Sequence, residues 1–182
     1  YIVAVAAVES FVNEAVVPAI VDQALETVVT SSKDRQALEK LDLRFKLMWL
    51  PHFAYGKTFV RNEQPYQDMR DLIELRNALV HYKMVAKAPN PVNDLVQRKM
   101  TLNTMSLFSS VWTEKLCCTE CVRWAHNTAC ETIRVLLSFI PSEFRNYLVC
   151  DETQFTPIED DEVESWFRDH RADVMPLTPA EN

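Results

Sequence analysis

The stretch YQDMRDLIELRNALVHYKM, residues 66–84, decides the fold class. It follows Pro65, a residue type that the first turn of a helix accepts, and it contains neither proline nor glycine. Its apolar residues recur at helical spacing, so this stretch predicts the strongest helix of the chain. On a helical projection they form a contiguous arc of about 200°. The arc comprises Met69, Leu72, Ile73, Leu75, Leu79, Val80, Tyr82 and Met84. We therefore expect this helix to be buried on more than one side.

One charged residue falls on the wrong side of this helix. The polar face consists of Arg70, Glu74, Asn77 and His81. Arg76 instead projects into the apolar arc, where an unpaired buried guanidinium costs several kcal/mol. We therefore expect a partner or water at Arg76.

The same helical spacing extends outward along the chain. It predicts a helix over 2–29 with a kink near Glu14, because Pro18 removes a backbone donor. A Thr-Ser-Ser cluster at 30–32 offers an N-cap for a second helix over 33–49, which is expected to end near Pro51. A further helix is expected over 119–140, with its apolar residues facing inward and Pro141 closing it. The inward residues are Val122, Ala125, Ala129, Ile133, Leu136 and Leu137.

The connections between these helices are polar. Residues 51–64 are expected to form a loop, and residues 92–116 are weakly periodic and are expected to form an insertion. Four long helices with such connections predict an all-α fold, an antiparallel helical bundle of four main helices. The composition agrees, since 48% of the residues are hydrophobic and 25% are charged. Gly56 is the only glycine, which excludes glycine-rich phosphate loops, Rossmann motifs and most all-β folds.

Charge divides the chain into two parts. Residues 150–182 carry ten acids against two arginines, so the total charge of −7 leaves residues 1–149 close to neutral. We expect one helical domain over 1–149 and an acidic C-terminal tail over 150–182, partly disordered or with one short helix. Cations outnumber acids between residues 57 and 99, which permits contact with RNA.

The cysteines indicate the compartment. Five cysteines, an odd number, suggest free thiols in a reducing environment. The apolar opening 1–8 lacks a basic region and is followed by Glu9 and Glu14, so it matches neither a signal peptide nor a membrane span. We expect a cytoplasmic protein without membrane contact.

The segment LIELRNALVHY, residues 72–82, resembles the signature of HEPN domains, in which a polar residue follows an Arg and a His stands four to six positions after it. Residues 8–14 and 38–51 also resemble the first two helices of that family, so the resemblance covers much of residues 1–140. It implies a small helical bundle, commonly dimeric, and an RNase of toxin–antitoxin or antiviral systems, with an antitoxin or regulatory protein as partner. In members silenced by nucleotidylation a Tyr stands two positions after the His. That position is Lys83 here and the Tyr is Tyr82, so this regulation is not expected.

The residues themselves suit metal-independent RNA cleavage. Imidazole exchanges protons near neutral pH, so His81 can accept the proton of the 2′-hydroxyl or donate one to the departing 5′-oxygen. Arg76 offers a permanently charged fork to the phosphate, and Asn77 can orient the His or bind the phosphate. Arg76 and His81 lie about 140° apart on an ideal helix, so we expect two copies of this helix to share one site in a homodimer. The products are then a 2′,3′-cyclic phosphate and a 5′-hydroxyl, and we expect no metal and no cofactor.

Other polar residues are candidates for supporting roles. Glu9 and Asn13, one turn apart, are candidates for positioning Arg76. Arg70, Lys83 and Lys87 are candidates for RNA binding.

Three alternatives stay open. Arg76 could form a purely structural ion pair with an acid of the first helix, such as Glu9 or Glu14. A HEPN-like dimer could also hold RNA, a nucleotide or a partner protein without cleaving it. Cys118 and Cys121 form a CxxC motif, but no second pair stands at zinc-ligand spacing, so buried structural thiols are favoured.

Overall fold

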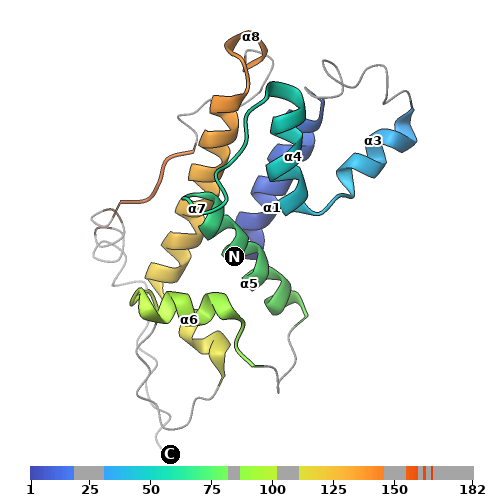
Figure 1. Ribbon diagram of the computed structural model, residues 1–182. Helices are drawn as coiled ribbons and strands as arrows, with labels where there is room; N and C mark the ends of the chain where they lie inside the picture. Colours follow the sequence, from blue (N-terminus) through green and yellow to red (C-terminus); the bar gives the residue numbers. More distant parts are fainter. Residues whose placement is uncertain are drawn as a thin grey trace, which may run out of the picture.

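All regular elements that the computed structural model describes are helical, which confirms the all-α expectation (Figure 1). It describes residues 1–18, 31–81, 87–101, 111–145 and 155–159, together with Glu162 and Ser165. The elements are α1 (Ile2–Phe11), the π-helical turn η1 (Val12–Val16), α3 (Ser32–Glu39), α4 (Leu43–Tyr55), α5 (Tyr66–Val80), α6 (Asn90–Gln97), the 3-10 helix η2 (Trp112–Leu116), α7 (Thr119–Phe139) and α8 (Ser142–Arg145). None of these described helices is both long and apolar enough to cross a membrane.

The core gathers around α7, which packs against α1, α4 and α5. Its fully buried side chains come from all four helices and include Val5, Val8, Leu47, Leu50, Met69, Leu72, Leu75, Leu136 and Leu137. In α1, α5 and α7 their helical spacing is the pattern from which the helices were predicted. In α4 the prediction relied on Leu38, Leu41, Phe45 and Met48, and it is wrong for Phe45, which is exposed, whereas Leu43, Leu47 and Leu50 are buried.

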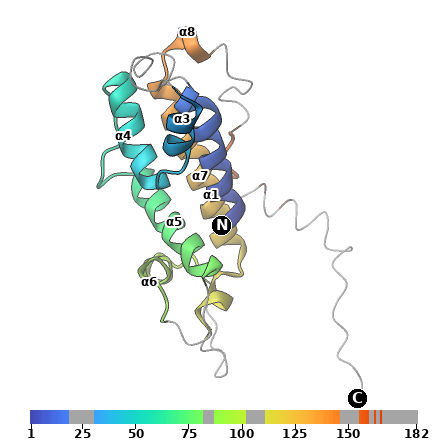
Figure 2. The same cartoon turned by 90° about the vertical axis from the view of Figure 1, so that its right-hand side faces the viewer.

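The directions of the helices differ from the expected antiparallel order. In both views α1, α4 and α7 run one way and α5 runs the other way (Figures 1 and 2). The Tyr1 hydroxyl accordingly donates to the Leu116 carbonyl, just before α7, at 2.8 Å. Lys57, just after α4, donates to the Ser138 carbonyl at the end of α7 at 3.2 Å. The return of the chain through the short helix α3 allows α4 to run parallel to α1.

The first predicted helix is regular only at its start. The π-helical turn η1 follows α1 and contains Glu14, near which a kink was expected. The helix continues to Pro18, and residues 19–30 lie outside the described part of the chain. The irregularity matches the donor that Pro18 lacks, because no N–H is available there for the Glu14 carbonyl.

The second predicted helix, 33–49, is two helices. Ser31 and Asp34 form a reciprocal capping box at the start of α3, so the expected N-cap is confirmed. The chain then breaks, and Asp42 caps α4 by accepting from the Arg44 amide at 2.9 Å. The expected end near Pro51 is wrong, because α4 continues past this buried proline to Gly56, whose positive φ of 65° ends the helix.

The third predicted helix is largely confirmed as α5, which starts at Tyr66 and is capped at its end by His81. Met69, Leu72, Ile73 and Leu75 are buried as expected. Val80, by contrast, is exposed, because it lies in the last turn beyond the packed surface. Tyr82, Lys83 and Met84 lie outside the described residues.

The predicted insertion at 92–116 is partly structured. Helix α6 packs on α5 and buries Val92 and Leu95, and Arg98 forms an ion pair with Asp68 of α5 at 2.6 Å. The 3-10 helix η2 leads into α7, and residues 102–110 lie outside the described part. The short helix α6 was missed because Pro89 and Pro91 mark a helix start here rather than only the end of the previous helix.

The fourth predicted helix is confirmed as α7, with one inward residue placed wrongly, since Val122 is exposed. Of the predicted tail, residues 155–159 lie against the helices. Phe155 makes an edge-to-face contact with Phe11 at 6.0 Å between centroids. The Asn127 side chain bonds to both backbone groups of Ile158, at 2.8 and 3.1 Å.

Candidate functional site

Arg76 and Glu9 form an ion pair between α5 and α1. The guanidinium Nη2 lies 3.7 Å from the Glu9 carboxylate, and the two side chains are 29% and 38% exposed. A pair this long and this accessible to water typically contributes less than about 1 kcal/mol to stability. Glu9 therefore neutralises the charge of Arg76 only in part and leaves the guanidinium accessible to solvent. The remaining N–H donors of Arg76 can bind a ligand.

A buried lysine lies beside this pair. Lys46 of α4 is 0% exposed. Its ammonium donates to the Asn13 side-chain oxygen at 2.8 Å and to the Glu39 carbonyl at the end of α3. Burial lowers the pKa of Lys46, whereas the negative charge of Glu9, Glu39 and Asp42 raises it. Lys46 thus ties together α4, the end of α3 and the π-helical turn, close to Glu9.

The two predicted positioning residues have different partners. Glu9 contacts Arg76, whereas Asn13 accepts a hydrogen bond from Lys46. Asn13 lies in η1, where the wider turn changes the direction of side chains relative to α1. Such π-helical turns occur frequently at functional sites. The result is a cluster of polar groups on α5, α1, α4 and η1, in which Arg76 pairs with Glu9 and Lys46 donates to Asn13.

Asn77 and His81 lie at the C-terminal end of α5, on the same helix as Arg76. His81 is exposed, and its backbone N–H donates to the Asn77 carbonyl at 3.0 Å. Asn77 is half-buried. Within the described residues no hydrogen bond fixes the His81 ring, so the imidazole is open to a ligand from solvent.

The candidate RNA-binding residues are placed unequally. Arg70 is exposed and pairs with Asp71 at 3.3 Å, so part of its charge is neutralised. Lys87 is exposed beyond the end of α5, whereas Lys83 lies outside the described residues.

Sequence reasoning missed Lys46. A lysine between Phe45 and Leu47 in an amphipathic helix is normally assigned to solvent, because lysine is almost never fully buried unless paired. The signal that could have found it is its position next to Leu50, at the edge of the arc that contains Leu43, Leu47 and Leu50.

The CxxC motif has the properties of structural thiols. Cys121 is buried, and this burial raises the pKa of its thiol to about 12. The thiols of Cys118 and Cys121 both point to the Met100 carbonyl, at 3.1 and 2.8 Å. Across the described ranges, no group of three or more His, Cys, Asp or Glu residues is arranged to hold a metal ion.

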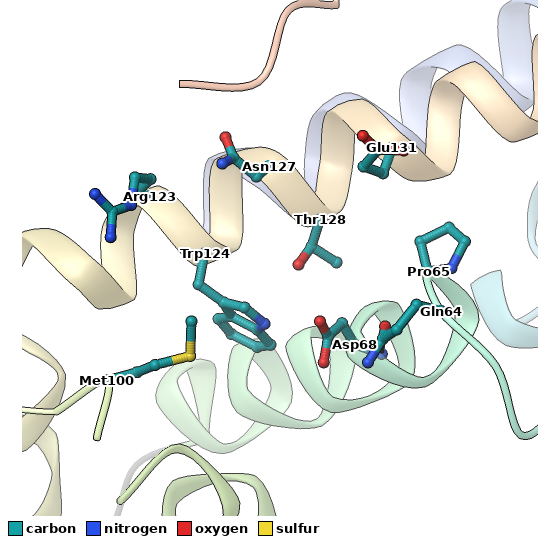
Figure 3. A pocket seen from close by; sticks show the side chains of 9 residues that line it. All are labelled: Gln64, Pro65, Asp68, Met100, Arg123, Trp124, Asn127, Thr128 and Glu131. Carbon is teal, nitrogen blue, oxygen red and sulfur yellow. Dashed lines mark hydrogen bonds between the residues drawn. The ribbon is translucent and has the colours of Figure 1, made fainter. Parts of the chain in front are cut away.

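A cavity of about 230 Å³ lies between the start of α5 and the middle of α7 (Figure 3). The Trp124 ring and the Asp68 carboxylate face each other across it. It is lined by Gln64, Pro65, Asp68, Met100, Arg123, Trp124, Asn127, Thr128 and Glu131. None of the predicted site residues lines it, so this cavity is separate from the Arg76 site.

Comparison with known proteins adds no information about the site. No family model matches the chain, and no significant match was found among curated proteins or solved structures.

Proposed function

We propose that this protein is a HEPN-type, metal-independent endoribonuclease that cleaves single-stranded or looped RNA and acts as a toxin or antiviral effector. The observation that carries the proposal is the Arg76–Glu9 pair, which holds a cation at the surface of α5 on the helix that presents Asn77 and His81. The resemblance of residues 72–82 to the HEPN signature supports the same assignment. An antitoxin or regulatory protein is the expected natural partner.

The proposed reaction is an internal transesterification. The 2′-oxygen attacks phosphorus as one His81 takes its proton, and the bond from phosphorus to the 5′-oxygen breaks as a second, protonated imidazole supplies a proton to that oxygen. Arg76 stabilises the charge that grows on the phosphate oxygens, and Glu9 keeps its guanidinium in place. The products carry a 2′,3′-cyclic phosphate and a 5′-hydroxyl.

The reaction needs two imidazoles at one phosphate, which one α5 does not supply. We propose that two copies of α5 pair across a twofold axis and bring two sets of Arg76, Asn77 and His81 into one cleft. Val80 is an exposed apolar residue at this end of α5, so it provides contact area for such a pairing.

The test is cleavage of labelled RNA in EDTA by the purified protein and by folded Arg76→Ala and His81→Ala variants. Arg134→Ala is the matched control, because Arg134 is an exposed arginine of α7 in an ion pair with Glu131 at 3.4 Å. We expect both site variants to lose cleavage and the control to retain it. Equal activity of His81→Ala excludes the proton-transfer role, and 5′-phosphate products exclude this chemistry. The absence of cleavage on every RNA tested favours the binding module instead.

A further inference from the structure

Helix α4 carries a row of exposed aromatic rings. Phe45, Trp49 and Phe53 follow one another at four-residue spacing and are 42%, 40% and 57% exposed. Their ring centroids are 6.0 and 5.8 Å apart, and the second pair is stacked at an interplanar angle of 23°. His52 joins them, with its ring 6.2 Å from Trp49 and 6.0 Å from Phe53. We call these four residues the aromatic stripe.

The aromatic stripe is not part of the core. The opposite face of α4 buries Leu43, Leu47 and Leu50. Among the ring–ring contacts of the described residues, those of the stripe join its members only to one another. Contiguous exposed apolar surface of this kind typically marks an interaction site.

The charge around the aromatic stripe is positive. Residues 43–62 contain four cations, no Asp and no Glu, in a chain whose net charge is −7. Of these cations Lys57 and Arg61 are exposed, Arg44 is exposed but pairs with Asp42 at 3.2 Å, and Lys46 faces inward. This local excess is complementary to a polyanion, although the whole chain is acidic.

We propose that the aromatic stripe binds single-stranded RNA by stacking of its unpaired bases, with Lys57 and Arg61 beside the phosphates. Aromatic rings flanked by cations are the combination that sequence-tolerant single-strand binding requires, because every base has a face that can stack. A duplex keeps its bases stacked inside, so it does not compete for the rings. The inference rests on the proposed function for the identity of the polymer as RNA.

The position of the stripe also fits delivery to the candidate site. The same helix that carries Trp49 outward carries Lys46 inward, to Asn13 and to the neighbourhood of Glu9. RNA bound on the outer face of α4 is therefore held by the helix whose Lys46 donates to Asn13, one turn from Glu9.

Binding is tested in a His81→Ala background, which removes cleavage and keeps the arginine. Fluorescence anisotropy measures the Kd of a labelled, unstructured RNA of about 12 nucleotides. We expect Trp49→Ala to weaken binding on the order of tenfold, and Trp49→Phe to restore most of it. Val122→Ala is the control, because Val122 is an exposed apolar residue on α7, and we expect this substitution to leave the Kd unchanged.

An unchanged Kd in Trp49→Ala overturns the proposal. If Trp49→Ala binds RNA normally but no longer forms the dimer seen by light scattering, the stripe binds a second copy of the chain and the proposal is wrong. If Trp49→Ala binds RNA normally but no longer binds anionic phospholipid vesicles, the stripe binds a membrane and the proposal is again wrong. The test is independent of catalysis. If Trp49→Ala weakens RNA binding but the parent protein does not cleave RNA, only the proposed RNase activity is refuted. If the parent protein cleaves RNA but Trp49→Ala binds it normally, only the proposed role of the aromatic stripe is refuted.

Discussion

At the scale of single residues, the Arg76–Glu9 pair separates a structural role from a functional one. A purely structural ion pair is expected to stabilise the fold. Because its atoms are 3.7 Å apart and both groups are partly exposed, this pair contributes little to the free energy of unfolding. A positioning role depends instead on where the guanidinium is held.

Glu9→Gln is the substitution that measures this difference. We expect it to change the free energy of unfolding by less than about 1 kcal/mol and to lower RNA cleavage on the order of 10- to 100-fold, because the guanidinium loses its orientation. Glu14→Gln is the control, since Glu14 is exposed and its partner among the described residues is Ser10, at 2.5 Å. If Glu9→Gln lowers the free energy of unfolding by more than about 1 kcal/mol and leaves the rate of RNA cleavage unchanged, the pair has a structural role only.

Cys121 provides a pH-dependent test of the buried CxxC motif. Its folded pKa of about 12 lies above the ordinary value of 9.0, so the folded state keeps the thiol proton while the unfolded state releases it. The stability due to this proton is complete below pH 9.0 and is lost as the pH rises toward about 12. The slope is at most about 1.4 kcal/mol per pH unit. Urea unfolding between these limits should show a shallower decline for Cys121→Ala than for the parent protein, and parallel curves contradict the assignment.

At the scale of elements, the polar junction at Lys46 joins α4 to η1 and to the end of α3. Lys46→Met keeps the apolar stem of the side chain but leaves the Asn13 oxygen and the Glu39 carbonyl without their donor. Hydrogen bonds from a charged donor contribute about 1.5–3 kcal/mol each, so we expect a loss of roughly 2 kcal/mol or more in urea unfolding. Arg44→Met, on the exposed side of the same helix, should cost less than about 0.5 kcal/mol. Equal losses show that the ammonium contributes nothing specific.

The elements also show what sequence reasoning can reach. Helical spacing correctly predicted α5 and α7, because long amphipathic segments without breakers carry a repeated signal. It joined α3 and α4, because the break at 40–42 spans less than one turn and the cap at Asp42 has no glycine or proline beside it. It also ended α4 too early, since a proline inside a helix costs only one hydrogen bond and a clash that packing can offset.

For the candidate site, the sequence predicted which residues are unusual but not what they touch. The apolar surroundings of Arg76 called for a partner, and Glu9 was among the residues proposed. The link from Asn13 to Lys46 could not be foreseen, because it depends on where α4 crosses the π-helical turn, and that crossing arises from tertiary packing.

At the scale of the whole molecule, a shared site makes a prediction about mixtures. Parent and His81→Ala proteins are refolded together in equal amounts, so that about half of the dimers are mixed. A mixed dimer retains one His81 where the proposed reaction needs two imidazoles, so we expect the mixture to cleave RNA at about a quarter of the rate of the same total amount of parent protein, which is the share of parent dimers. A rate of about half, in proportion to the parent protein present, contradicts a site shared between copies.

The parallel run of α1 beside α7 has a consequence for synthesis on the ribosome. The contact of Tyr1 with Leu116 joins residues 115 positions apart, so α1 finds its packing partner only after the 115 residues that follow Tyr1 have been translated. At about 5–20 residues per second, α1 and the Glu9 that it carries wait several seconds without that partner. The Arg76–Glu9 pair therefore cannot be held in place before α7 has been made. We expect a ribosome-bound fragment that lacks α7 not to cleave the RNA around it.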